Sequence, residues 1–212
     1  MRALRERIRR AIAVAALSAA ALVAGGACAA DSAIVTDSPE ATVASLHRGL
    51  IAASQAHSAA NVAERYRALE PLITQTHDLA YIAEFALRKQ WPSLSEGDRQ
   101  RFVAAFEKLS VITYASRFKN VTANTFKSGG GSTVESGRAH VLTSIARKDQ
   151  PDIPLDYMLE QKDGAWRIIN IIADGVSDLA LKRAEYQRIL SSGTIDDLIK
   201  ELDAQTARLQ QP

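Results

Sequence analysis

The sequence predicts an α+β fold, in which helices come before and after one antiparallel sheet. Apolar residues recur at helical spacing from about residue 39 to 118, and again from residue 177 onward. Between them, from Val121 to Ala173, β-branched residues dominate and turn residues separate short runs. Helices and strands that are segregated along the chain are typical of α+β folds. We therefore expect a four-stranded antiparallel sheet, packed with N-terminal helices and closed by C-terminal helices.

Residues 1–30 have the pattern of a secretory signal peptide. Five arginines lie within the first ten residues, an alanine-rich run follows, and Ala27-Cys28-Ala29 resembles a cleavage site. A basic start, an apolar stretch and an A-x-A site are typical of export. We predict cleavage after Ala29 or Ala30, which leaves residues 31–212 as a single lipid-binding domain. The alternative is an uncleaved inner-membrane anchor over residues 11–30, because a span needs about 20 apolar residues.

The composition of the predicted mature chain excludes two classes of protein. Cys28 is the only cysteine and lies in the predicted signal, so the mature chain would have no disulfide and no thiol chemistry. Lipidation of Cys28 is an alternative, although the usual branched aliphatic residue three positions earlier is missing. The precursor has 26 basic and 24 acidic residues, and removal of residues 1–30 leaves a net charge of −2. A nucleic-acid-binding protein usually keeps a basic excess, so we expect no nucleic-acid partner.

The helical segments begin at recognisable signals. Ser38 before Pro39, Asn61, and Ser95 with an acid three residues later are typical N-caps. Pro71 is expected to kink the second helix. A third helix is predicted from about Asp78, the longest over 96–118, and two more follow Ser177 and Thr194.

The predicted strands cover residues 121–126, 138–147, 153–161 and 166–173. Gly129–Gly131 is interpreted as a flexible hairpin tip, and Asp163-Gly164 as a tight hairpin turn. Simple alternation in the last strand places Trp166, Ile168 and Ile172 on one face. Its other face is apolar too, which a strand with a solvated face would not be. We therefore expect this strand to be covered on both sides, with the Trp166 face toward a cavity.

No motif for catalysis or metal binding stands out. The four histidines do not pair at helical spacing, no cysteine cluster supports them, and the glycine run lacks the Lys-Ser/Thr of a phosphate loop. Asp156 and Asp174 are the best candidates for acid–base chemistry, because an apolar site can tune a carboxyl group. The alternative is that both are solvated. We expect no enzyme activity, no metal and no cofactor.

Aromatic and aliphatic residues of the predicted helices and strands are candidates for the lining of a lipid cavity. An apolar ligand covered by them would gain roughly 25 cal/mol per Å² buried. The alternative for each residue is that it fills the core. The set comprises Tyr81, Phe85, Phe102, Phe106, Tyr114, Phe118, Val141, Leu155, Tyr157, Trp166, Ile168 and Ile172.

Three segments carry a resemblance to a known family. They are DGAWRIINIIADGVS with the following Arg183 and Tyr186, the helix FVAAFEKLSVITYASRF (102–118), and the helix of residues 81–91. Together they resemble the MlaC-like, toluene-tolerance family of periplasmic lipid carriers over about residues 40–205. The similarity is closest to the HpnM branch, which is associated with hopanoid biosynthesis. At Asn170 the chain departs from the family pattern, in which an acid is common.

The resemblance implies an NTF2-like core with extra helices, and a cavity that takes acyl chains with the head group outward. The ligand would be a phospholipid, or a hopanoid for this branch. Implied partners are an inner-membrane ABC-type lipid transporter complex and an outer-membrane lipoprotein complex, with the carrier as a monomer. Basic residues near the expected mouth would meet head groups or partners: Arg138, Arg147, Lys148, Lys182 and Arg183. Two alternatives stay open, an enzyme that uses Asp156 or Asp174 and an envelope assembly module without lipid.

Overall fold

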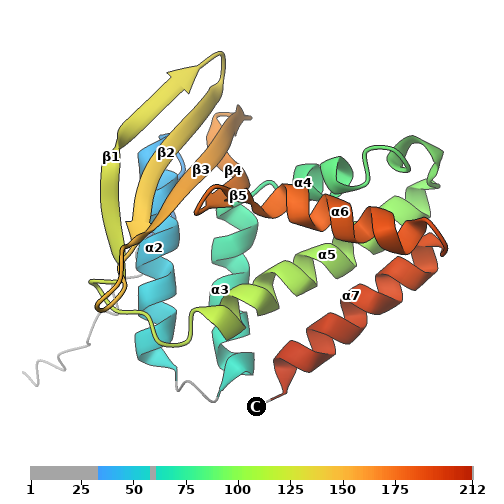
Figure 1. Ribbon diagram of the computed structural model, residues 1–212, viewed down its shortest axis with the longest axis horizontal. Coiled ribbons are helices and arrows are strands. Elements are labelled where there is room, and N and C mark those ends of the chain that lie inside the picture. The colour runs from blue at the N-terminus through green and yellow to red at the C-terminus, as the bar shows by residue number, and fades with distance from the viewer. Residues whose placement is uncertain (1–32, 58–60, 212) are drawn as a thin grey trace, which may run out of the picture. The chain divides into compact units, whose positions relative to one another are not determined.

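A computed structural model describes residues 33–57 and 61–211, which form helices before and after one sheet (Figure 1). The expected signal peptide and Cys28 lie outside the described residues. The elements in order are α2 (Pro39–Ala56), α3 (Val62–Thr76), α4 (Leu79–Ala86), the 3₁₀ turn η1 (Trp91–Ser93), α5 (Glu96–Arg117), β1 (Phe126–Glu135), β2 (Arg138–Ile145), β3 (Ile153–Lys162), β4 (Ala165–Ala173), β5 (Val176–Ser177), α6 (Asp178–Leu190) and α7 (Ile195–Gln210). The predicted α+β class is confirmed.

The predicted N-caps hold the first turns of three helices. The side chains of Ser38, Asn61 and Ser95 each accept a hydrogen bond, 3.1 Å long, from the backbone N–H three residues later. These bonds satisfy N–H groups that have no partner within the helix. The starts of these three helices could therefore be predicted from capping residues alone. Pro71, a separate feature, lies inside α3.

The sheet is an antiparallel meander in the order β1 to β5, with a longer connection, residues 146–152, between β2 and β3 and short turns elsewhere. Three of the turns are Ser136-Gly137, Asp163-Gly164 and Asp174-Gly175, in which the first residue has φ of 50–53° and the glycine 78–79°. Two consecutive residues with positive φ are characteristic of the turn that suits right-twisted strands. The turn at Asp163-Gly164 is thus as predicted.

The glycine run is not a hairpin tip, which corrects the sequence prediction. Residues 129–131 lie inside β1, where the register with β2 shifts between Ser128 and Ser132. A Cβ atom on Gly129 would come within 2.6 Å of the Leu142 carbonyl oxygen. Glycine is needed there because the two backbones approach closely within an irregular strand pair. The tip of this hairpin is Ser136-Gly137.

The sheet has five strands instead of the predicted four. After the Asp174-Gly175 turn, β5 runs back along β4 and pairs with Ile172 and Ala173 before α6 begins. The strand pattern of the sequence did not reveal this fifth strand, because it is only two residues long. This strand determines the direction in which α6 leaves the sheet.

A β-bulge in β4 corrects the predicted faces of that strand. Ile168 lies opposite Leu159, whereas Asn170 lies opposite Met158, so Ile169 is an extra residue in β4. Side chains on one strand alternate, and directly opposed residues share a face. Asn170 and Ile172 are therefore on the opposite face from Ile168. Trp166 and Ile168 share the inner face with Ile171 and Ala173 beyond the bulge.

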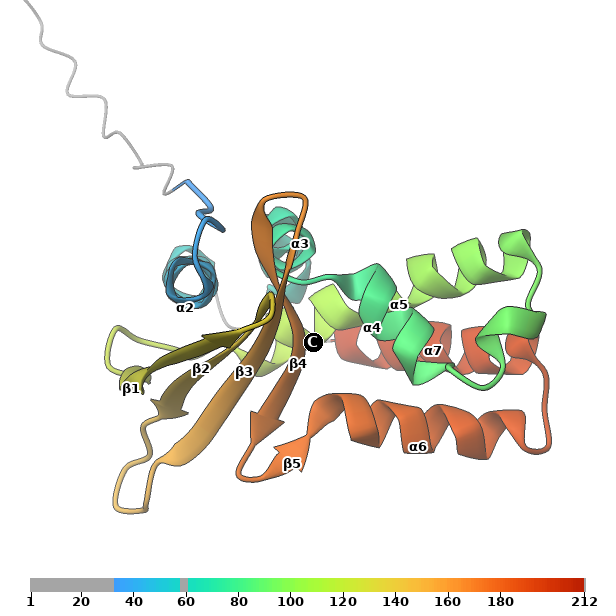
Figure 2. The ribbon, with the colours of Figure 1, turned by 90° about the horizontal axis from the view of Figure 1, so that it is seen from above.

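The inner face of the sheet packs against α2 and α3, which lie on the same side of it in Figure 2. The long helix α5 packs against α3, α4 and α7, and α6 packs against α4 and β4. Arg65 of α3 is 1% exposed, and its Nε donates to the carbonyl oxygen of Ala115 at 2.8 Å. This charge-assisted bond ties α3 to the last turn of α5.

The turn before α6 yields a prediction that separates backbone strain from side-chain contacts. Gly175 has φ of 79°, and an added Cβ there would meet no atom within 4 Å, while a Cβ on Gly97 in the first turn of α5 would meet only Ser95 Oγ at 3.9 Å. We expect Gly175→Ala to destabilise the protein by about 1–2 kcal/mol, because an L-residue is strained at positive φ. Gly97→Ala should instead be neutral or stabilising by up to about 1 kcal/mol. Urea denaturation measures both changes, and equal effects would contradict the prediction.

Candidate functional site

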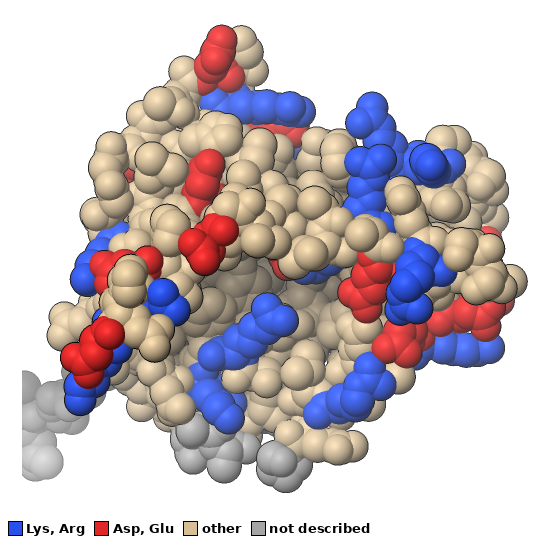
Figure 3. Space-filling view, in the orientation of Figure 1, with Lys and Arg blue, Asp and Glu red and all other residues tan. Residues whose placement is uncertain are grey.

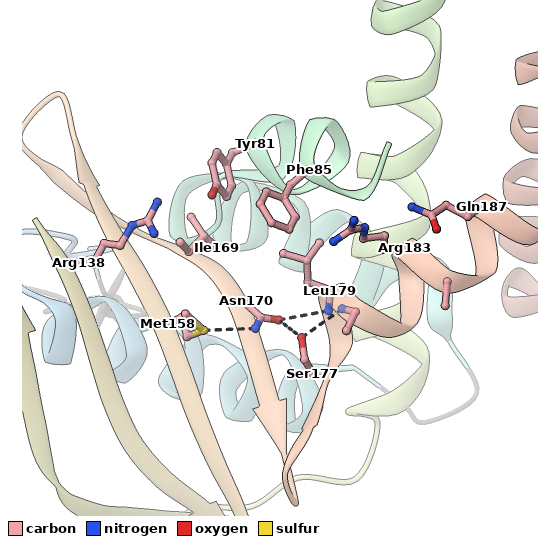
Figure 4. A pocket seen from close by; sticks show the side chains of 12 residues that line it. Tyr81, Phe85, Arg138, Met158, Ile169, Asn170, Ser177, Leu179, Arg183 and Gln187 are labelled. Atoms are coloured by element: carbon pink, nitrogen blue, oxygen red, sulfur yellow. Dashed lines mark hydrogen bonds between the residues drawn. The ribbon is translucent and has the colours of Figure 1, made fainter. Parts of the chain in front are cut away.

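A pocket of about 470 Å³ lies between β3–β4, α4 and α6 (Figure 4). This volume falls within the range of roughly 300–1,000 Å³ that is usual for small-molecule sites. Most of its lining is apolar, and two arginines lie at its sides. The lining residues are Tyr81, Phe85, Arg138, Met158, Ile169, Asn170, Ser177, Leu179, Ala180, Arg183, Ala184 and Gln187.

The apolar walls come from α4, β4 and the start of α6. Tyr81 and Phe85 lie one turn apart on α4 and stack with ring centroids 5.9 Å apart. Ile169, the extra residue of the β4 bulge, is 4% exposed and lies outside the core cluster that includes Ile168. The bulge therefore gives β4 two adjacent buried isoleucines, one in the core and one in the wall of the pocket.

Asn170 organises the junction between the sheet and α6. Its Oδ1 accepts from the Leu179 backbone N–H at 3.2 Å and from the Ser177 hydroxyl at 3.1 Å, and its Nδ2 approaches the Met158 sulfur at 3.3 Å. Ser177 also caps α6. The side chain of Asn170 thus satisfies a first-turn N–H of the helix from the neighbouring strand. An aspartate in this position could accept the same two hydrogen bonds.

The two arginines of the pocket have different surroundings. Arg138 is exposed and donates through Nε and Nη2 to Glu160 Oε1, at 3.2 Å in each case. Arg183 is half-buried, and its side chain has no hydrogen bond or ion pair with any residue that the structure describes. Gln187 lies one turn after it, and its Nε2 is buried without a partner in the described chain.

Sequence reasoning placed Arg183 near the expected mouth, but it missed the other small and polar residues that α6 contributes to the pocket. Ala180, Arg183, Ala184 and Gln187 follow the spacing i, i+3, i+4, i+7, so they form one stripe on the helix. The periodicity of apolar residues does not reveal such a stripe, because it contains only small and polar side chains. Because the alanine side chains are short, the space between α6 and α4 stays unfilled.

Of the twelve predicted cavity residues, Tyr81 and Phe85 line this pocket, and the others lie elsewhere. Phe102 and Phe106 are at most 1% exposed, and each meets the ring of Tyr186 edge-on, at 5.8 and 6.5 Å between centroids. They anchor α6 to α5. Five more belong to the core on or near the inner sheet face: Val141, Leu155, Tyr157, Trp166 and Ile168. Ile172 is half-buried on the outer face because of the bulge.

Tyr114, Phe118 and Tyr157 take part in a second, partly buried region, built from aromatic and histidine side chains. His77 Nε2 lies 2.9 Å from the Tyr114 hydroxyl, and His47 Nε2 lies 2.9 Å from the Tyr157 hydroxyl. The Phe118 ring stacks on Tyr114, 5.5 Å between centroids. Burial lowers the pKa of both histidines to about 4, and for His77 the carbonyl of Ile73 opposes that shift. Neutral imidazoles therefore hold this region together at neutral pH.

The acid–base candidates do not meet in the pocket. Asp174 is exposed in the turn before β5, and Asp156 lies on the outer sheet face, where His140 Nδ1 contacts both carboxylate oxygens at 2.9 and 3.0 Å. Neither aspartate lines the pocket. Of the other basic residues expected at the mouth, Lys182 pairs with Asp178, and Arg147 and Lys148 are exposed near the β2–β3 turn.

Charge distribution, metal ligands and helix hydropathy are three further properties of the described residues. On the face drawn in Figure 3, basic and acidic side chains are interspersed around a central hollow, without one dominant sign. Within residues 33–57 and 61–211, no three His, Cys, Asp or Glu side chains gather into a metal site. In the same part of the chain, no helix has the length and hydropathy to span a bilayer.

Comparison with known proteins agrees with this geometry. The model of the family described as MlaC protein matches residues 45–204. Among solved structures, a phospholipid-binding protein from Ralstonia solanacearum, determined in complex with a phospholipid, has a TM-score of 0.67 at 18% identity. The match covers 81% of this chain and 98% of that chain. A search of curated proteins finds no match.

The fold and pocket define an α+β protein with a largely apolar pocket between its sheet, α4 and α6. The chain belongs to the MlaC protein family, because the family model covers most of its length. The resemblance in residues 102–118 and 163–186 is thus confirmed at the level of the family. At this level of identity, the Ralstonia structure shows that the two chains share a fold.

The role of Asn170 can be tested by two substitutions of similar size. We expect Asn170→Leu to destabilise the protein by about 1–3 kcal/mol, because the Leu179 N–H and the Ser177 hydroxyl lose their acceptor. Asn170→Asp keeps an acceptor near the start of α6, where a negative charge is favourable, so it should cost less. Guanidinium denaturation at neutral pH gives both values. Equal losses would show that the two hydrogen bonds contribute nothing measurable.

The buried histidines predict acid sensitivity. Between about pH 6.5 and 4, His47 and His77 are neutral when folded and protonated when unfolded, so the unfolded state binds more protons. Stability reaches its maximum above pH 6.5 and falls as the pH drops toward 4, by about 1.4 kcal/mol per pH unit for each histidine. Urea titrations should show this slope, and His77→Gln should reduce it. An unchanged slope in a folded His77→Gln variant would contradict the prediction.

Proposed function

We propose that this protein is an exported lipid-binding carrier that moves a phospholipid or hopanoid-type lipid through the periplasm. Residues 1–30 would direct export and be removed. The apolar pocket between α4, β4 and α6 would hold at least part of the acyl or hopanoid chain. The observation that carries the proposal is a pocket with a largely apolar lining in a chain of the MlaC family.

Two further observations support lipid as the ligand. The structural neighbour from Ralstonia solanacearum is a phospholipid-binding protein. The walls made by Tyr81, Phe85, Ile169 and Leu179 offer apolar contact with few directional groups, which suits a chain of methylenes. Burying such a chain gains roughly 25 cal/mol per Å². A carrier needs this gain to hold its ligand in water.

The proposal includes partners that the family resemblance implies. The carrier would exchange lipid with an inner-membrane ABC-type transporter complex and with an outer-membrane lipoprotein complex, and it would act as a monomer. Of the alternatives, an enzyme that uses Asp156 or Asp174 is less well supported, because neither carboxylate reaches the pocket. An assembly module without ligand is less well supported because the molecule contains this pocket.

Lipid occupancy tests the proposed function directly. The full chain, expressed and purified from the periplasm, should carry lipid that mass spectrometry detects in solvent extracts. Ala184→Trp places an indole into the pocket from α6, so we expect lipid occupancy to fall several-fold without loss of fold. Ala68→Trp, at an exposed position of α3, is the matched control and should keep full occupancy. Wild-type protein that neither retains nor takes up any lipid would refute the carrier.

A further inference from the structure

We propose that Arg183 and Gln187 form an oxyanion-binding site on the α6 wall of the pocket, which takes the phosphate or carboxylate of an amphiphilic ligand. The site would hold the head group while the chains contact the walls from α4 and β4. This inference rests on the proposed function, since it assigns the polar end of the lipid to named side chains.

The first observation is a guanidinium without a counter-charge. Arg183 is half-buried in the pocket lining and has no partner within the described chain. Its neighbour Lys182 is paired with Asp178, and Arg138 on the other side of the pocket is paired with Glu160. A charge that is partly removed from water without a partner is unfavourable. An anion that arrives with the ligand would remove this penalty.

The second observation is a buried donor beside that guanidinium. Gln187 Nε2 is buried and lacks an acceptor, and Gln187 follows Arg183 by four residues on the same face of α6. Figure 4 shows both side chains reaching from α6 toward the side of the pocket where Phe85 lies. Buried donors in native proteins nearly always have an acceptor. A ligand oxygen between the two side chains would supply one.

The third observation is the electrostatic character of the lining. It contains two arginines and no aspartate or glutamate, so no acidic side chain of the lining would repel an anion. The planar guanidinium suits a carboxylate or phosphate because it can donate two parallel hydrogen bonds. The adjacent apolar residues Phe85, Ile169 and Leu179 suit the attached chains. Together these groups fit an amphiphile with an oxyanion head group better than a neutral lipid.

Binding experiments with chain-matched ligands test this site. Affinities of the full-length mature protein are measured for phosphatidate, for diacylglycerol with the same chains, for palmitate and for inorganic phosphate. We expect the wild type to prefer phosphatidate to diacylglycerol by tenfold or more. Arg183→Gln should weaken the binding of phosphatidate and of palmitate roughly tenfold to a hundredfold, because a charge-assisted hydrogen bond is lost. Diacylglycerol binding should not change.

Two further variants separate binding from folding. Arg188→Gln removes one positive charge from an exposed position of the same helix and should leave every affinity unchanged. Gln187→Met has a similar shape but no donor. It should weaken phosphatidate binding severalfold, while the lipid-free protein melts at the same or a higher temperature, because an unpartnered buried donor is gone.

The outcomes distinguish failure of this inference from failure of the proposed function. If Arg183→Gln weakens the binding of phosphatidate and of diacylglycerol equally, or changes neither affinity, the oxyanion site is overturned and the lipid carrier stands. If inorganic phosphate binds as tightly as phosphatidate, the site recognises a free anion and the assignment to a lipid head group is overturned. If the wild type binds none of the lipids but binds inorganic phosphate through Arg183, the anion site stands and the carrier fails.

Discussion

The arrangement of the whole molecule depends on one constraint, the burial of β4 on both faces. A regular strand presents alternate residues to opposite sides. One fixed alternation along β4 would therefore have to place suitable side chains both in the core and on the outer face. The bulge at Ile169 relaxes this requirement. It places Ile168 in the core and Ile169 in the pocket wall, and it turns Asn170 toward the start of α6. Core, pocket and helix attachment are thus all positioned by one inserted residue.

The position of α6 follows from this constraint and creates the pocket. The Asp174-Gly175 turn and β5 fold the chain back before the helix begins, and Asn170 holds its first turn. Farther along, Tyr186 is fixed between Phe102 and Phe106 of α5. Between these two attachments α6 presents Ala180 and Ala184, which are too short to fill the space beside α4. A pocket remains because α6 is held in place at both attachments, while the alanine side chains between them are too small to fill the space.

The pocket combines apolar walls with unpaired donors, whereas several buried polar side chains elsewhere have partners within the described chain. His47 and His77 are paired with tyrosine hydroxyls, and Arg65 with a backbone carbonyl. Arg183 and Gln187, in contrast, point into the pocket without partners in the described chain. Such a distribution is expected of a ligand site, because polar groups without internal partners are retained where something else pairs with them.

The sequence by itself determined the α+β class, the helix starts and the family, because caps, glycine turns and hydrophobic periodicity act over a few residues. Tyr81 and Phe85 could also be predicted as pocket residues, since both are aromatic side chains on one face of a short helix. Only the tertiary structure decided that Ile169, not Ile168, faces the pocket, and that Phe102 and Phe106 anchor α6. A bulge depends on the partner strand, and the exposure of Arg183 to a pocket depends on how α6 packs. Neither is encoded in the spacing of residues along one element.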